Sequence, residues 1–126
     1  MFTGVVIEES LENKDVLQEF RITDSTIEKV TNKHATPRLS QWTKHTVEIP
    51  DDNIDETAEM ISSALEQRWY ADFKNDQWHY IIYKGKIFKV DLRNPVLYKH
   101  AKQYGISLGI PEYQVDFAPD DEVWER

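Results

Sequence analysis

The stretch that most constrains the fold is WYADFKNDQWHYIIYKGKIFKVD, which runs from Trp69 to Asp91. It divides into candidate strands at Trp69–Phe73, Trp78–Tyr83 and Lys86–Asp91, which are separated by turn-forming residues. In the second turn, Gly85 can adopt the positive φ angle that a tight hairpin demands. The third strand alternates apolar and polar side chains with the period of two that a sheet imposes. The stretch therefore predicts three antiparallel strands, and a sheet this aromatic needs a covering layer.

Three further strands are expected before this stretch. Phe2–Ile7 and Gln41–Ile49 are rich in β-branched and apolar residues. Arg21–Val30 is also β-branched but more polar, which indicates an edge or half-exposed strand. Between these strands, Glu8–Phe20 has weak helical character, and Thr31–Ser40 is the longest irregular segment expected inside the domain.

Two helices complete the predicted order. After Pro50, apolar residues recur at helical spacing and form one stripe, which consists of Ile54, Ala58, Ile61 and Leu65. A second helix is expected to start at Asn94-Pro95 and to stop at Gly105. The chain therefore predicts an α+β fold with a mostly antiparallel sheet and two or three helices on one face. A β-α-β-β-α-β core with an added hairpin would make it a ferredoxin-like variant.

Composition narrows the class of protein. With 126 residues and 40% hydrophobic content, the chain is expected to form a single α+β domain over 1–117, followed by an acidic C-terminal tail over 118–126. The absence of cysteine excludes disulfides and thiolate metal sites. The N-terminus has neither the basic region of a signal peptide nor an apolar run long enough for a membrane span. We therefore expect a cytoplasmic protein that does not bind membranes.

The charges are unevenly distributed along the chain. The net charge of −8, from 23 acidic and 15 basic side chains, repels phosphates and disfavours nucleic-acid binding. The segment Lys84–Lys102 is nevertheless basic, whereas the tail Glu112–Arg126 is acidic. Three interpretations stay open: two separate solvated faces, a tail that folds back on the basic segment, or a basic segment that meets an acidic partner.

No motif of a known reaction is present. The four histidines lack metal-binding spacing and the glycines match no nucleotide-binding loop, so neither a metal nor a cofactor is expected. Asp72 and His79 lie on adjacent predicted strands, and a carboxylate that orients an imidazole is the beginning of a general base. Whether they share a face depends on the register of the turn between them. The alternative is an ordinary cross-strand polar pair on a solvated face.

Aromatic side chains supply the other candidate site. One of the two faces of the Trp78–Tyr83 strand is expected to be partly exposed, and exposed Tyr80 and Tyr83 would mark an interaction surface. Core or cross-strand packing is the alternative for these rings.

Two blocks of the sequence resemble a family of small uncharacterised bacterial and archaeal proteins. They are WYADFKNDQWHYIIYKGKIFKVD, similar to a WYAxF and FKGKxF hairpin, and YGISLGIPEYQVDF, similar to YGxxLGIPxxQxDF. The resemblance covers roughly Val47 to Phe117, and Tyr83 stands where the FKGK block has phenylalanine. It implies a fold and an intracellular location, and it transfers no activity or catalytic residue.

Three functions are compatible with these observations. A non-catalytic binding domain, for a protein partner or a second copy of the chain, would use Tyr80 and Tyr83 beside the basic segment. An enzyme or small-ligand-binding domain would use a pocket between sheet and helices, with Asp72, His79 and His45 as its polar groups. Nucleic-acid binding through the basic segment is the least favoured of the three.

Overall fold

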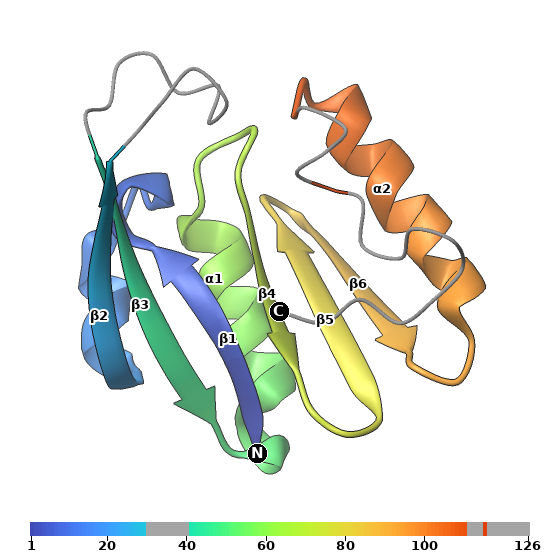
Figure 1. Cartoon of the computed structure of the whole chain (residues 1–126), viewed down its shortest axis with the longest axis horizontal. Coiled ribbons are helices and arrows are strands. Elements are labelled where there is room, and N and C mark those ends of the chain that lie inside the picture. The colour runs from blue at the N-terminus through green and yellow to red at the C-terminus, as the bar shows by residue number, and fades with distance from the viewer. Residues whose placement is uncertain (30–40, 111–114, 116–126) are drawn as a thin grey trace.

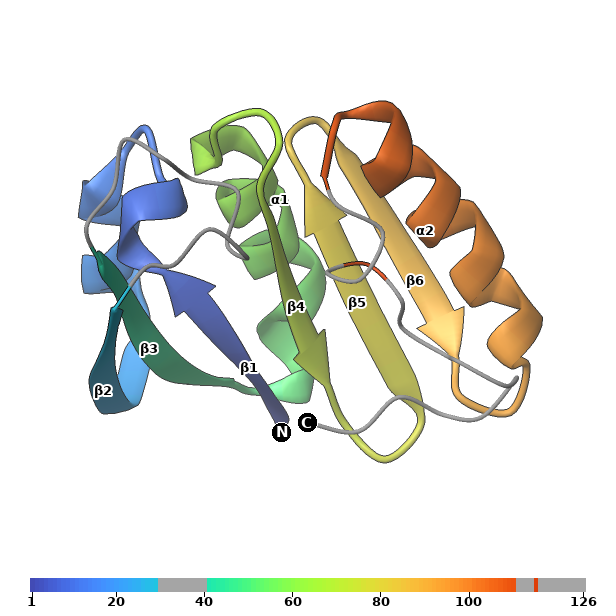
Figure 2. The ribbon, with the colours of Figure 1, turned by 45° about the horizontal axis from the view of Figure 1, so that its top comes forward.

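The computed structural model describes residues 1–29, 41–110 and 115, and its fold is built on one six-stranded sheet (Figure 1 and Figure 2). The strands are β1 (Phe2–Ile7), β2 (Arg21–Lys29), β3 (Gln41–Ile49), β4 (Tyr70–Lys74), β5 (Trp78–Tyr83) and β6 (Lys86–Asp91). Their order across the sheet is β2-β3-β1-β4-β5-β6, and each neighbouring pair is antiparallel. The predicted α+β class with an antiparallel sheet is confirmed, and so is the edge position of the polar strand β2.

The two α-helices of the described residues cover opposite faces of the sheet. Helix α1 (Ile54–Ala64) shares one buried core with Tyr80 and Ile82, whereas α2 (Tyr98–Ser107) shares a second core with Ile81 and Tyr83. Successive residues of a strand point to opposite faces, so each face of β5 has its own helix. The expectation of helices on one face is therefore wrong. Both faces of the central hairpins are apolar, and each needs a separate cover.

The expected ferredoxin-like arrangement is present in the first four strands. Strands β3 and β4 flank β1 and are both antiparallel to it, so β3-α1-β4 is a split β-α-β unit that encloses β1. Strands β1 and β2 likewise flank β3 and are both antiparallel to it, so β1, the segment Glu8–Phe20 and β2 form the second split unit, which encloses β3. Val16 of that segment shares a core with α1, so both connections cover the same face of the sheet. The first four strands therefore form a ferredoxin-like core, which the β5–β6 hairpin and α2 extend as the predicted variant.

The weakly helical segment Glu8–Phe20 forms two short 3₁₀ helices instead of one α-helix. They are η1 (Glu8–Ser10) and η2 (Lys14–Glu19), and the Asn13 side chain caps the second by accepting a hydrogen bond from the Asp15 backbone N–H at 3.2 Å. Similar turns, η4 (Asp51–Asn53) and η5 (Pro95–Leu97), precede α1 and α2. The apolar residues of Glu8–Phe20 are too sparse to bury one face of a longer helix.

Helix α2 runs past the predicted stop at Gly105. Gly105 lies inside the helix and is buried against Tyr83, whose hydroxyl oxygen would be 2.7 Å from an added Cβ. The chain leaves the helix at Gly109, which has a φ of +90° and whose N–H donates to the Ile106 carbonyl at 2.9 Å. The N–H of Ile110 donates to the Gly105 carbonyl at 3.2 Å, which completes the usual glycine-based helix end.

Some expectations fall on residues outside the described ranges. They are the loop Thr31–Ser40, the acidic tail 118–126 and any contact of that tail with the basic segment. Within the basic segment, Lys84 contacts the Glu12 carboxylate at 3.2 Å and Arg93 pairs with Asp91 at 3.0 Å. In the described residues, no helix combines the length and the apolar character needed to cross a bilayer.

Candidate functional site

The structure joins Asp72 and His79 in a buried chain of polar side chains. Asp72 on β4 and His79 on β5 point to the same face, and the Asp72 Oδ2 lies 2.7 Å from the His79 Nε2. The other ring nitrogen, Nδ1, lies 2.7 Å from the hydroxyl of Tyr98, the first residue of α2. Only 2%, 1% and 2% of Asp72, His79 and Tyr98 are exposed. The pair is thus not on a solvated face, and it links the sheet to α2.

The protonation of this chain follows from its burial. Loss of hydration, reinforced by the nearby charge of Lys74, lowers the pKa of His79 from 6.5 to about 3, so the imidazole is neutral at pH 7. Burial raises the pKa of Tyr98 to about 12, so its hydroxyl keeps its proton. The Tyr98 O–H then donates to Nδ1, and the Nε2–H donates to Asp72. Both ring nitrogens are engaged in this buried chain, so the imidazole joins β4 and β5 to α2.

The lowered pKa of His79 predicts acid sensitivity. Between pH 6.5 and about 3 the unfolded chain binds a proton at this histidine that the folded chain does not, so stability falls as the pH falls through this window. The expected contribution is up to about 1.4 kcal/mol per pH unit. Chemical denaturation of the wild type and of His79→Gln at several pH values measures it. The variant should show a shallower slope, and equal slopes would contradict the assignment.

Tyr80 and Tyr83, the other predicted site residues, are both buried. They lie on opposite faces of β5 and are 2% and 0% exposed. The Tyr80 hydroxyl donates to Asp55 at the start of α1 at 2.6 Å, and the Tyr83 hydroxyl donates to the Ala101 carbonyl in α2 at 2.7 Å. Burial raises the pKa of both phenols. The expected surface of exposed hairpin aromatics is therefore wrong, because a helix covers each face of β5.

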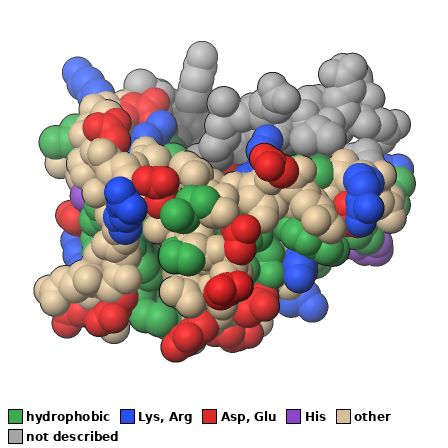
Figure 3. All heavy atoms as spheres, turned by 90° about the horizontal axis from the view of Figure 1, so that it is seen from below, with side chains coloured by type: hydrophobic (Ala, Val, Ile, Leu, Met, Phe, Trp, Pro, Cys, Tyr) green, Lys and Arg blue, Asp and Glu red, His purple; other side chains and the backbone are tan. Residues whose placement is uncertain are grey.

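A surface cavity lies beside Tyr80. It has a volume of about 450 Å³, and its lining includes Asp55, Glu56, Glu59 and Lys89. The ammonium of Lys89 lies 4.4 Å from the centre of the Trp78 ring, and the three carboxylates of the lining outnumber it, so the cavity is negative overall. Figure 3 shows the molecule from below, where acidic side chains gather around the start of α1. This surface disfavours phosphate ligands, and acidic residues alone do not define a binding site.

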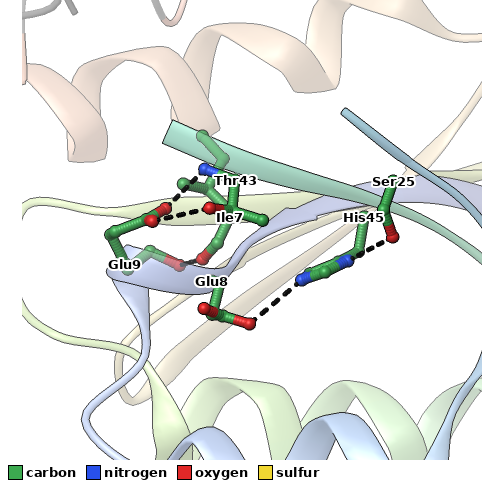
Figure 4. A network of polar contacts seen from close by, with 7 residues as sticks. Ile7, Glu8, Glu9, Ser25, Thr43 and His45 are labelled. Atoms are coloured by element: carbon green, nitrogen blue, oxygen red, sulfur yellow. Dashed lines mark hydrogen bonds and ion pairs between the residues drawn. The ribbon is translucent and has the colours of Figure 1, made fainter. Parts of the chain in front are cut away.

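A second polar network ties β2 to the rest of the sheet (Figure 4). Ser25 on β2 lies directly opposite His45 on β3, and its hydroxyl oxygen is 2.7 Å from the His45 Nδ1. The His45 Nε2 is 3.2 Å from the Glu8 carboxylate in η1. Next to it, Glu9 accepts two hydrogen bonds from Thr43, one from the backbone N–H at 2.6 Å and one from the hydroxyl at 2.8 Å. Of this group, only His45 was predicted from the sequence to belong to a site.

The order hydroxyl, imidazole, carboxylate resembles that of a serine hydrolase, but the surroundings do not favour that chemistry. Ser25 is exposed to water on an edge strand. Acyl transfer needs a cleft that excludes water and N–H donors aimed at the developing oxyanion. The geometry instead matches a cross-strand polar pair that fixes β2 on β3.

The most exposed strand of the described chain is β2. It is nine residues long and eight of them are exposed, and among the described strands only β3 pairs with it. Ile22 and Ile27 are 38% and 66% exposed and share a face, since they lie opposite Val47 and Thr43, two positions of equal parity on β3. The polar residues of β2 indicated an edge strand, but nothing in the sequence indicated that Ile22 and Ile27 both stay uncovered.

Comparisons with protein-family models, curated proteins and solved structures find no match to this chain. The family resemblance of the two sequence blocks accordingly stays a resemblance, and the function rests on the geometry alone.

Proposed function

We propose that this protein is a cytoplasmic, non-catalytic interaction domain that accepts an extended protein segment along the open edge of β2. The observation that carries the proposal is a nine-residue edge strand exposed along nearly its whole length. Such an edge presents a row of backbone N–H and C=O groups that an added strand can pair with. Main-chain hydrogen bonds would supply affinity, and the side chains that alternate along the edge would supply specificity.

The side chains of β2 favour a protein partner. Ile22 and Ile27 offer two apolar contacts on one face, within a strand that also carries charged and hydroxyl side chains. An isolated edge strand of this length would be an aggregation hazard without such polar residues and without a bulge. Strand β2 has both, since its pairing with β3 shifts between Ile22 and Asp24. These features allow a specific contact while they limit indiscriminate pairing.

The edge is held in place before any partner arrives. Besides the Ser25–His45 contact, the Thr23 hydroxyl donates to the Thr46 carbonyl at 3.3 Å. Lys44 on β3 pairs with Glu28 on β2 at 2.6 Å. A strand that is already ordered loses little conformational entropy on binding, which favours association.

The other edge of the sheet is less suited to strand addition. Strand β6 has six residues, and its exposed positions are Lys86 and Lys89. Exposed lysines are a common means of keeping an edge strand unpaired. The enzyme alternative with Asp72 and His79 is also less supported, because both side chains are buried and both imidazole nitrogens are engaged.

Photo-crosslinking in cells of the protein's own source tests this function. A benzoylphenylalanine at position 27 is expected to crosslink to protein at least about tenfold more than one at position 96, where Val96 is 53% exposed but lies far from β2 in the sequence. Mass spectrometry then identifies the crosslinked chain. Equal yields at the two positions would contradict a binding role for the β2 edge.

A further inference from the structure

We infer that the segment that pairs with β2 is the β2 strand of a second copy, related by a two-fold axis that passes beside Ser25. This inference rests on the proposed strand-accepting edge and names its partner. A two-fold axis perpendicular to the sheet makes two copies of the same edge strand antiparallel, so the six-stranded sheets of two copies would continue into each other.

The bulge in β2 sets the register. From Ser25, Ile27 is two ladder steps away in one direction. Ile22 is also two ladder steps away in the other direction, because β3 offers no separate partner to Thr23, which lies in the bulge between Ile22 and Asp24. With Ser25 opposite Ser25, Ile22 of each copy therefore lies opposite Ile27 of the other. All these side chains project from the same face, so the two copies present matching surfaces.

The next ladder position brings opposite charges together. Arg21 lies one step beyond Ile22 and Glu28 one step beyond Ile27, and both project from the other face of the sheet. In the two-fold register, Arg21 of each copy lies opposite Glu28 of the other. Glu28 already pairs with Lys44, and its carboxylate can accept from two cations. The contact thus contains two isoleucine pairs and two Arg–Glu pairs, each a favourable type of cross-strand pair.

The neighbouring registers are disfavoured by charge. A shift of two ladder steps in one direction places Asp24 opposite Glu28, and the same shift in the other direction places Asp24 opposite its own copy. Like charges directly opposite each other destabilise a strand pair. Shifts of one step would place the isoleucines against the opposite face. The sequence of β2 therefore selects one antiparallel pairing with itself.

The contact is small, so the dimer is expected to be weak. Pairing of one strand per copy buries less surface than a standard stable interface, which predicts a dissociation constant on the order of micromolar. The net charge of −8 on each chain also opposes association at low ionic strength. At about 0.15 M salt the charges beyond about 8 Å are screened, which is the condition in which the dimer should be measured.

A charge exchange tests the register directly. Arg21→Glu places two acids opposite each other, and Glu28→Arg places two arginines opposite each other, so each variant should dimerise at least about tenfold more weakly than the wild type. A 1:1 mixture should regain a dimer, because each position 21 then faces a position 28 of opposite charge on the other variant. Sedimentation velocity over a range of protein concentrations measures all four samples. Recovery in the mixture also shows that both variants are folded.

Two controls carry the same charge changes away from β2. Lys99→Glu on α2 and Glu59→Arg on α1 replace exposed side chains and should leave dimerisation unchanged. A mixture that stays monomeric, or controls that weaken the dimer as much, would overturn the inference. If position 27 still crosslinks to a different protein in that case, the strand-accepting function stands and only the identity of the partner is wrong. If position 27 crosslinks to no protein more strongly than position 96 does, the strand-accepting function and the proposed dimer are both wrong.

Discussion

Replacing His79 with leucine is expected to lower the free energy of unfolding by about 3–5 kcal/mol, the usual cost of removing one member of a buried polar pair. The change removes the N–H that reaches the Asp72 carboxylate at 2.7 Å and the nitrogen that accepts from the Tyr98 hydroxyl at 2.7 Å. Leucine fills much of the volume but offers neither group. Urea denaturation monitored by tryptophan fluorescence measures the loss.

Two comparisons separate the hydrogen bonds from the volume. His79→Gln keeps an amide N–H near the position of Nε2 and should recover part of the stability. His100→Leu changes an exposed histidine of α2 and should alter stability by less than about 0.5 kcal/mol. The double variant Asp72→Leu/His79→Leu should lose less than the sum of the two single losses, since the second change has no partner left to disrupt. Additive losses would show that the contact contributes nothing.

The second large effect is expected from Gly4→Ala, at about 3 kcal/mol of destabilisation. Gly4 lies on β1 opposite Phe73 of β4, and an added Cβ would be 1.9 Å from the Asp72 carbonyl oxygen and 2.7 Å from the Phe73 ring. The oxygen belongs to the backbone and cannot rotate away, so the two strands must separate. The pairing of β1 with β4 joins the β2-β3-β1 half of the sheet to the β4-β5-β6 half.

Thermal denaturation followed by circular dichroism checks this effect. Thr3→Ala is the matched control, because it changes the neighbouring residue of β1, which is exposed. The control should shift the melting temperature by little, whereas Gly4→Ala should shift it by more than about 10 °C. A stable Gly4→Ala protein would contradict the close approach of β1 and β4.

The strands were predictable because local patterns determine them. Four strands have the predicted bounds, because alternation, β-branched residues and turn residues agree in each of them. They are Phe2–Ile7, Gln41–Ile49, Trp78–Tyr83 and Lys86–Asp91. The burial of Tyr80 and Tyr83 was not predictable in this way. It depends on α1 and α2 lying on opposite faces, which no local pattern specifies.

The candidate site was likewise predictable only where a local pattern determines it. The pairing of Asp72 with His79 required the register of the β4–β5 turn, and Tyr98 joins them only through the packing of α2. The polarity of β2 did indicate an edge strand. Its match with a second copy depends on the bulge at Thr23, because without this extra residue Ile22 and Ile27 would not lie at equal distances from Ser25.

Amide hydrogen exchange of the unmodified protein tests the role of β2 most directly. Spectra recorded well below and well above the dissociation constant should differ in the amides of Arg21–Lys29, whose outward N–H groups become protected when a second β2 pairs with them. The amides of the other edge strand, β6, should exchange at the same rate in both samples. Protection that is independent of protein concentration, or that rises at β6 and not at β2, would contradict the pairing of β2 with a second copy.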